Sequence, residues 1–143
     1  TRTASDLRFD FDGSAEGWKP GNDLDVFSVT DGILQTQTTG GDPYMVRSNS
    51  RIDAADVSAV RLRMALDPGM SEAAQFFWTT ADDPGMDQAK SVPFEAIADG
   101  EFHELVIPVA SHPRWSGTVT AIRVDPSAGE PTGRVQIDFI RGE

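Results

Sequence analysis

The stretch Val60-Arg61-Leu62-Arg63-Met64-Ala65-Leu66 has a large apolar side chain at every second of its seven positions. Successive side chains of a β-strand point to opposite faces, so this pattern predicts a half-buried strand with Val60, Leu62, Met64 and Leu66 toward the core. Asp67-Pro68-Gly69 follows at once, and these residue types predict a turn that ends the strand.

Short strands separated by turn residues recur along the whole chain. Asp31-Gly32 lies between the strand candidates 26–29 and 33–38, which predicts a two-residue hairpin. Further strands are expected at 7–11, 75–80, 102–107, 119–124 and 134–140, with weaker candidates at 44–46 and 91–97. Helical turns are expected only at 53–57 and 71–74, because no segment has a long 3.6-residue period. We therefore expect residues 1–143 to form one all-β domain, an antiparallel β-sandwich.

The composition excludes several classes of partner and chemistry. Lys and Arg number 12 against 23 Asp and Glu, and a net charge of −11 argues against a nucleic-acid partner. No apolar run approaches the ~20 residues of a membrane helix, so no membrane partner is expected. The absence of cysteine excludes disulfides and thiolate metal sites. Thr1–Asp6 is polar and lacks the apolar segment of a signal peptide, and the missing initiator Met suggests a mature or trimmed chain. Nothing in the sequence suggests an obligate dimer, so we expect a monomer.

The sequence contains none of the usual catalytic motifs. It has no glycine-rich phosphate loop, no HExxH and no GxSxG. Nothing in the sequence places His103 or His112, the only two histidines, in a catalytic triad. Close pairs of carboxylates are expected by chance in so acidic a chain, so they do not indicate a glycosidase site. We expect a binding protein and not an enzyme.

Alternation places three arginines on outer sheet faces. Arg61 and Arg63 point away from the apolar side of their strand, and Arg123 does so in 119–124. One interpretation is that their forked donors meet a ligand hydroxyl or uronate group. The other is that they form ion pairs with Asp125, Glu104 or Asp138.

The aromatic residues leave two alternatives open. In the strand 75–80, Phe76 and Trp78 form the more apolar face and are favoured as core residues, which would leave Gln75 and Phe77 on the outer face. The alternative is that Trp78 is exposed and serves as a platform for a ligand. Trp115, in a loop, is expected either to stack on a ligand or to cap the core. Tyr44, after a Gly-Pro-rich turn, could border a cleft. The candidate ligand-binding residues are Tyr44, Arg61, Arg63, Gln75, Trp78, His103, Trp115 and Arg123.

A lone acid in the last strand suggests a cation site. Asp138 is expected on the face opposite Val135, Ile137 and Phe139. If the first and last strands pair, Asp138 would approach Asp10 or Asp12. Carboxylates so placed repel each other unless a cation or an arginine lies between them.

Several of these segments together resemble a known class of module. The segments are Phe9-Asp10-Phe11-Asp12-Gly13 through Trp18, Asp99-Gly100-Glu101-Phe102-His103-Glu104, Trp115-Ser116-Gly117, Ile122-Arg123-Val124-Asp125-Pro126 and Val135-Gln136-Ile137-Asp138-Phe139-Ile140. They are similar to jelly-roll, galactose-binding-like carbohydrate-binding modules found beside bacterial polysaccharide-degrading enzymes.

The resemblance implies a non-catalytic module. Such a module would bind a polysaccharide or oligosaccharide and target a secreted glycoside hydrolase or polysaccharide lyase, whose catalytic domain belongs to the same parent chain. It also implies a structural calcium, with the ligand roles falling on Asp12 and Asp138. The sequence shows no clean row of three exposed aromatic residues, which disfavours a crystalline polysaccharide. The alternative is a structural spacer that packs on a catalytic domain and binds no sugar.

Overall fold

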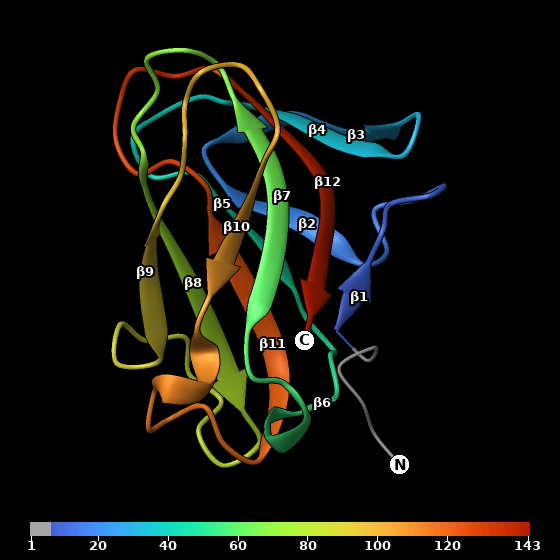
Figure 1. Cartoon of the computed structure of the whole chain (residues 1–143), viewed down its shortest axis with the longest axis vertical. Helices are drawn as coiled ribbons and strands as arrows, with labels where there is room; N and C mark the ends of the chain where they lie inside the picture. Colours follow the sequence, from blue (N-terminus) through green and yellow to red (C-terminus); the bar gives the residue numbers. More distant parts are fainter. Residues whose placement is uncertain (1–6) are drawn as a thin grey trace.

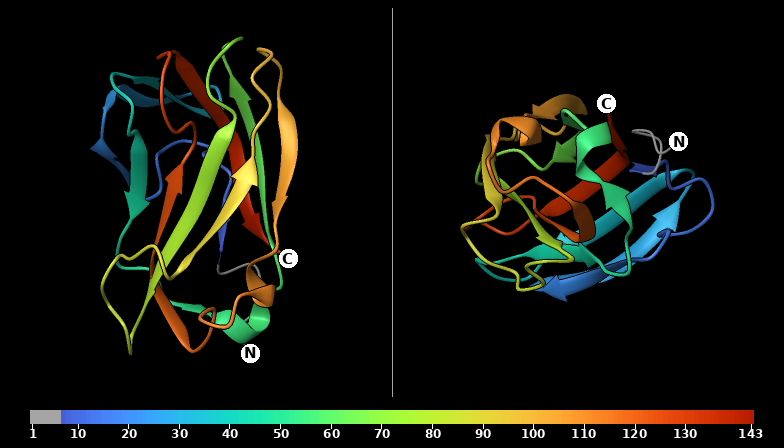
Figure 2. Two further views of the ribbon diagram at one scale, coloured as in Figure 1. Left: turned by 90° about the vertical axis from the view of Figure 1, so that its left-hand side faces the viewer. Right: turned by 90° about the horizontal axis from the view of Figure 1, so that it is seen from below.

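The computed structural model describes residues 7–143 and shows two antiparallel sheets packed face to face (Figure 1). Figure 2 shows the sheets as the two layers of a sandwich, with loops closing both ends. The expected all-β sandwich is therefore confirmed. The polar segment Thr1–Asp6 lies outside the described residues.

Each layer mixes strands from distant parts of the sequence. Sheet A has the order β10 (His103–Ile107), β7 (Val60–Leu66), β12 (Arg134–Gly142), β4 (Ile33–Thr38) and β3 (Leu24–Thr30), with β1 (Arg8–Phe9) on β12. Sheet B has the order β2 (Trp18–Asn22), β5 (Tyr44–Arg47), β11 (Thr118–Asp125), β8 (Ala73–Thr80) and β9 (Ser91–Glu95), with β6 (Ile52–Asp53) on β11. The 3-10 turns are η2 (Ala54–Asp56) and η3 (Val109–Ser111).

Most strand predictions hold, and the exceptions have a physical reason. In the predicted hairpin the chain reverses direction at Asp31 and Gly32, which both have positive φ. The first strand is shorter than 7–11, and 71–74 is not helical. Strand β2 was not expected, because Lys19-Pro20-Gly21-Asn22 has the residue types of a turn. Its backbone nevertheless pairs with β5 as an edge strand.

The core lies between the two sheets. Val60, Leu62, Met64 and Leu66 are buried as predicted, and they meet Phe76, Trp78 and Ile122 of sheet B within one apolar cluster. Among the residues described, no helix is long and apolar enough to cross a membrane.

A bulge in β12 overturns the alternation expected for the last strand. The register shifts between Ile137 and Phe139, after which Phe139 pairs with Arg63 and Ile140 pairs with Leu62. Ile140 therefore points into the core, while Phe139 lies on the outer face, where the Arg141 guanidinium covers its ring at 3.8 Å from the centroid. The expectation that Phe139 shares the core face of Val135 and Ile137 is wrong.

Candidate functional site

The outer face of sheet B gathers aromatic, cationic and acidic side chains from three neighbouring strands. Tyr44 comes from β5, Arg123 and Asp125 from β11, and Phe77 from β8. Arg123 lies opposite Val46 on one side and Phe77 on the other, so β11 carries it to the middle of the face. The strand order β5-β11-β8 thus joins residues that are far apart in the sequence.

Arg123 is held from three directions. Its guanidinium carbon lies 3.6 Å from the ring centroid of Tyr44 and 4.3 Å from that of Phe77. Its Nε donates to Asp125 Oδ1 at 2.7 Å and its Nη2 donates to Asp125 Oδ2 at 2.8 Å. This bidentate geometry, combined with cation–π contacts on two rings, fixes the guanidinium plane before any ligand arrives.

Burial and pairing set the protonation of this ion pair. Burial raises the pKa of Asp125, and the two hydrogen bonds from Arg123 oppose that effect only in part. For Arg123, burial acts to lower the pKa, but the hydrogen bond and charge of Asp125 outweigh it and the pKa is raised. Two donors of the Arg123 guanidinium are engaged by the Asp125 carboxylate, so the pair offers no free cation to an anionic ligand.

Amide and hydroxyl groups continue the same face. Gln75 lies opposite Asp125 in the strand register, and its Nε2 donates to Ser91 Oγ at 2.8 Å. Farther along β8 and β11, the hydroxyls of Thr79 and Thr120 share a hydrogen bond of 2.8 Å. These groups are of the kind that meets the hydroxyls of a polar ligand.

The absence of a side chain at Gly21 leaves space for the Tyr44 ring. A Cβ at position 21 would lie 2.5 Å and 2.6 Å from two carbons of that ring. Any larger residue at this position in β2 would displace the tyrosine from Arg123, so the edge strand helps to shape the face.

Two hollows extend the face beyond this cluster, which we call the Tyr44–Arg123 cluster. One, of about 350 Å³, is lined by residues of β2 and β5 that include Lys19 and Val46. The other, of about 430 Å³, is lined by Arg51, Thr120 and their neighbours, and both hollows include Asn49. The face therefore has room for a ligand longer than the cluster itself.

Of the predicted ligand-binding residues, Tyr44, Gln75 and Arg123 lie together on this face. The others do not join them. Arg61, Arg63 and His103 belong to sheet A, which forms the opposite layer.

These three sheet A residues already have partners. Arg61 contacts Glu143 at 3.0 Å and Glu104 at 3.4 Å. Arg63 contacts Asp138 at 2.9 Å and His103 contacts Asp99 at 2.9 Å. The ion-pair interpretation of the outer arginines therefore describes the contacts of Arg61 and Arg63, as well as the contact of Arg123 with Asp125.

Both tryptophans named as candidate ligand-binding residues are buried. The core interpretation of Trp78 and the capping interpretation of Trp115 are therefore confirmed, and the platform interpretation of both is wrong. Trp78 is 0% exposed and its Nε1 donates to the Arg114 carbonyl at 3.1 Å. Trp115 is 7% exposed and its Nε1 donates to the carbonyls of Ala54 and Val57. The rings pack edge to face with their centroids 5.1 Å apart, so they close one end of the core.

The residues present do not fit the calcium site that the resemblance implies. The first and last strands do pair, but Asp138 Oδ2 accepts from Arg63 Nη1 at 2.9 Å, and Asp10 binds Arg141 at 2.7 Å. Within residues 7–143, no group of three or more His, Asp or Glu side chains is arranged to hold a metal ion. The guanidinium groups of Arg141 and Arg63 neutralise Asp10 and Asp138. A calcium ion on Asp12 and Asp138 stays a prediction without structural support.

Two residues of the cluster carried a weaker signal in the sequence. Asp125 follows Arg123 by two positions, and in a strand that spacing puts both side chains on one face. Phe77 alternates with Trp78, so its outward position follows once Trp78 is in the core. Gly21 carried no signal, because its role depends on a ring from another strand.

No protein-family model and no curated protein matches the sequence, whereas solved structures do. A low-affinity xylan-binding module of family 86 from the gut symbiont Roseburia intestinalis superposes with a TM-score of 0.57 and 14% identity, over 95% of this chain and 92% of that one. A family 29 carbohydrate-binding module complexed with cellulohexaose gives 0.60 and 11%, over 94% and 91%.

A third similar structure is a larger protein. An agarase gives a TM-score of 0.68 and 10% identity over 96% of this chain, but the match spans 26% of the agarase. The described chain therefore has the β-sandwich fold found in carbohydrate-binding modules.

Proposed function

We propose that this chain is a non-catalytic carbohydrate-binding module that holds a saccharide chain on the outer face of sheet B. The Tyr44–Arg123 cluster is the observation that carries the proposal. Saccharides are bound by apolar ring faces next to fixed planar hydrogen-bonding groups, and this cluster combines both. Because Arg123 is already fixed by two rings and a carboxylate, little side-chain freedom remains to be lost on binding.

The charges of the face favour a neutral saccharide. Asp125 neutralises Arg123 and further raises the cost of bringing a uronate or sulfate close to it. The net charge of −11 repels a polyanion at longer range. The ligand class is therefore a neutral oligosaccharide or polysaccharide chain.

The biological setting is part of the same proposal. The fold also occurs as about a quarter of an agarase chain, where 26% of that protein is matched. This supports a module that accompanies the catalytic domain of a secreted polysaccharide-degrading enzyme.

The test is affinity gel electrophoresis followed by calorimetry on the isolated chain. Xylan and soluble cellulose derivatives serve as neutral ligands, and polygalacturonate serves as the acidic one. We expect retardation by a neutral polymer, and binding at least about tenfold weaker in Tyr44→Ala.

Arg61→Ala is the matched control, because it removes an outward side chain from the other sheet and should leave binding unchanged. Unchanged binding in Tyr44→Ala, or selective binding of polygalacturonate, would contradict the proposal.

The spacer alternative requires a docking patch. The large exposed apolar residues of the described chain are Val26, Met86, Ile97 and Val106. They lie in β3, in the loop after β8, in the segment after β9 and in β10, and β3 and β10 form the two opposite edges of sheet A, so Val26 and Val106 do not share one patch. The structure therefore offers no specific observation in favour of a spacer.

A further inference from the structure

A bulge opens the sheet between β3 and β4. Asp25 pairs with Gln37 and Ser28 pairs with Gln35, so β3 has an extra residue between these two pairs. Val26 lies in the bulge with a φ of 51° and is 71% exposed. Positive φ is unfavourable for a β-branched residue, so the surrounding structure holds Val26 in this conformation.

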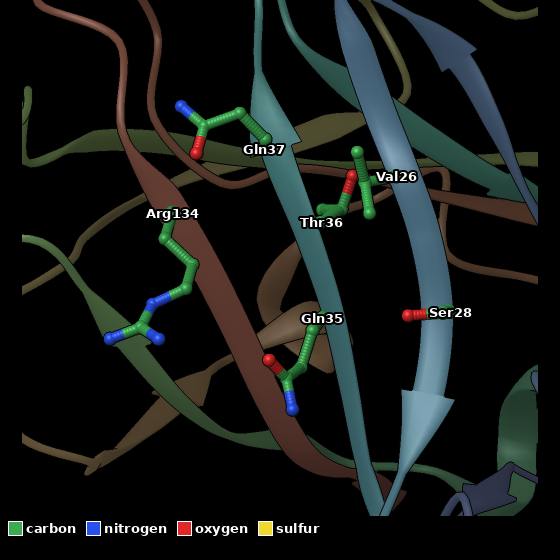
Figure 3. A pocket seen from close by; sticks show the side chains of 6 residues that line it. All are labelled: Val26, Ser28, Gln35, Thr36, Gln37 and Arg134. Atoms are coloured by element: carbon green, nitrogen blue, oxygen red, sulfur yellow. The ribbon is translucent and has the colours of Figure 1, made fainter.

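The bulge creates a hollow of about 240 Å³ on sheet A, lined by Val26, Ser28, Gln35, Thr36, Gln37 and Arg134. Figure 3 shows Val26 and Thr36 facing each other between β3 and β4, with Ser28 directed toward β4. The same view shows Gln35, Gln37 and Arg134 extending from β4 and β12 on one side.

The strand register aligns these side chains in two rows. Gln35 is opposite Ser28 in β3 and opposite Gln136 in β12. Gln37 is opposite Arg134 in β12. The spacing of two residues between Gln35 and Gln37 puts both amides on the same face.

The hydrogen-bonding capacity of this surface is largely unused. Among residues 7–143, no side-chain hydrogen bond joins Gln35 or Gln136 to another residue, and Gln37 makes one long bond of 3.3 Å to the Thr38 carbonyl. Arg134 Nε lies 3.8 Å from Asp67 Oδ1, too far for a hydrogen bond. By contrast, Arg63 and Arg141, elsewhere on the same sheet, are held by carboxylates at 2.9 Å and 2.7 Å.

We propose that this hollow is a second binding surface for a neutral saccharide, separate from the Tyr44–Arg123 cluster. A carboxamide presents one donor and one acceptor side by side and so matches a pair of neighbouring hydroxyls. The methyl groups of Val26 supply an apolar contact for the C–H side of a sugar ring. The proposal rests on the proposed function for its ligand class, but its residues belong to the other sheet, so the two surfaces can be occupied at once.

The experiment is a titration of ¹⁵N-labelled protein with xylohexaose and cellohexaose, followed by two-dimensional NMR. Four proteins are compared: the natural sequence, Gln35→Ala/Gln37→Ala, Tyr44→Ala, and Arg61→Ala as the control outside both surfaces. In the natural sequence we expect two groups of shifted amides, one in β3, β4 and β12 and one in β5, β8 and β11. The glutamine variant should weaken the first group about tenfold and leave the second unchanged.

The outcomes separate this proposal from the proposed function. Shifts confined to β5, β8 and β11 would overturn the second surface and leave the module intact. Shifts confined to β3, β4 and β12 that disappear in the glutamine variant would support the second surface and overturn the Tyr44–Arg123 assignment. Shifts in β3, β4 and β12 that persist in the glutamine variant, or no shifts with either probe, would overturn the second surface.

Discussion

Replacing Arg123 with methionine removes both donors from the Asp125 carboxylate while keeping an apolar chain between the rings of Tyr44 and Phe77. Breaking a buried ion pair by removing one partner costs about 3–5 kcal/mol. The two side chains are 17% and 10% exposed, so water reaches them slightly. We therefore expect the lower end, about 3 kcal/mol, for the loss of unfolding free energy in Arg123→Met.

A second substitution tests the cause of that loss. In Arg123→Met/Asp125→Asn no charge remains to be buried, so we expect the double variant to recover about 1–2 kcal/mol. Urea denaturation followed by tryptophan fluorescence measures both values. If Asp125→Asn instead adds to the loss, the carboxylate is not held chiefly by Arg123 and the reasoning fails.

The pH dependence gives an independent check with a definite sign. Burial raises the pKa of Asp125, so its ionised form costs stability, and that cost is relieved as pH falls through the folded-state pKa. Removing Arg123 makes the ionised form costlier still. The difference in unfolding free energy between the natural protein and Arg123→Met should therefore be smaller at pH 4 than at pH 7. An unchanged difference would refute this account.

Trp78→Ala should lower the melting temperature by about 10 °C, because truncation of a fully buried tryptophan costs about 3–5 kcal/mol. A variant that keeps its melting temperature but loses sugar binding would restore the platform interpretation. Gly21→Ala should weaken saccharide binding through displacement of Tyr44, and retained affinity in calorimetry would show that the ring tolerates the added methyl group. Asp10→Asn should lower stability at pH 7 and lose that effect in strong acid. Burial acts to raise the pKa of Asp10, but Arg141 and Arg8 lower it overall. The stabilisation of the folded state by the Asp10 carboxylate is therefore present above the unfolded-state pKa and disappears as pH falls through the folded-state pKa. Thermal melts across pH 2–7 measure this stabilisation. EDTA should leave the melting temperature unchanged, and a rise on adding calcium would reinstate the metal site.

Local pattern was enough to predict the sandwich but not all of its strands. Val60–Leu66 alternates because one side of β7 is buried, and burial acts on every second residue. Phe139 departs from the expected alternation because a bulge in β12 places it on the outer face. A bulge does not change the composition of the strand, so the sequence pattern does not indicate it. The loop position of Trp115 left open whether its ring stacks on a ligand or caps the core, because its indole Nε1 donates to backbone carbonyls about sixty positions away in the sequence.

The candidate site was partly visible in the same way. Alternation identified Arg123, and Gln75 followed from its strand, but nothing local indicated that Tyr44 meets Arg123. That contact depends on β5 lying beside β11, and these strands are adjacent only because of the order in sheet B. Non-local strand pairing is a property of the whole chain, which explains why the residues could be named and their grouping could not.

The ion pairs of the outer faces argue for a neutral ligand on energetic grounds. Arg63, Arg123 and Arg141 each contact a carboxylate within 2.9 Å. An anionic ligand that bound to any of these three arginines would have to displace its intramolecular partner, leaving a carboxylate without its cation in an already acidic protein. A neutral saccharide displaces none of them, because the Tyr44 ring and the amides on both faces can accept it with every ion pair intact. The pairing of these arginines with acidic side chains is therefore an energetic argument for the neutral saccharide of the proposed function.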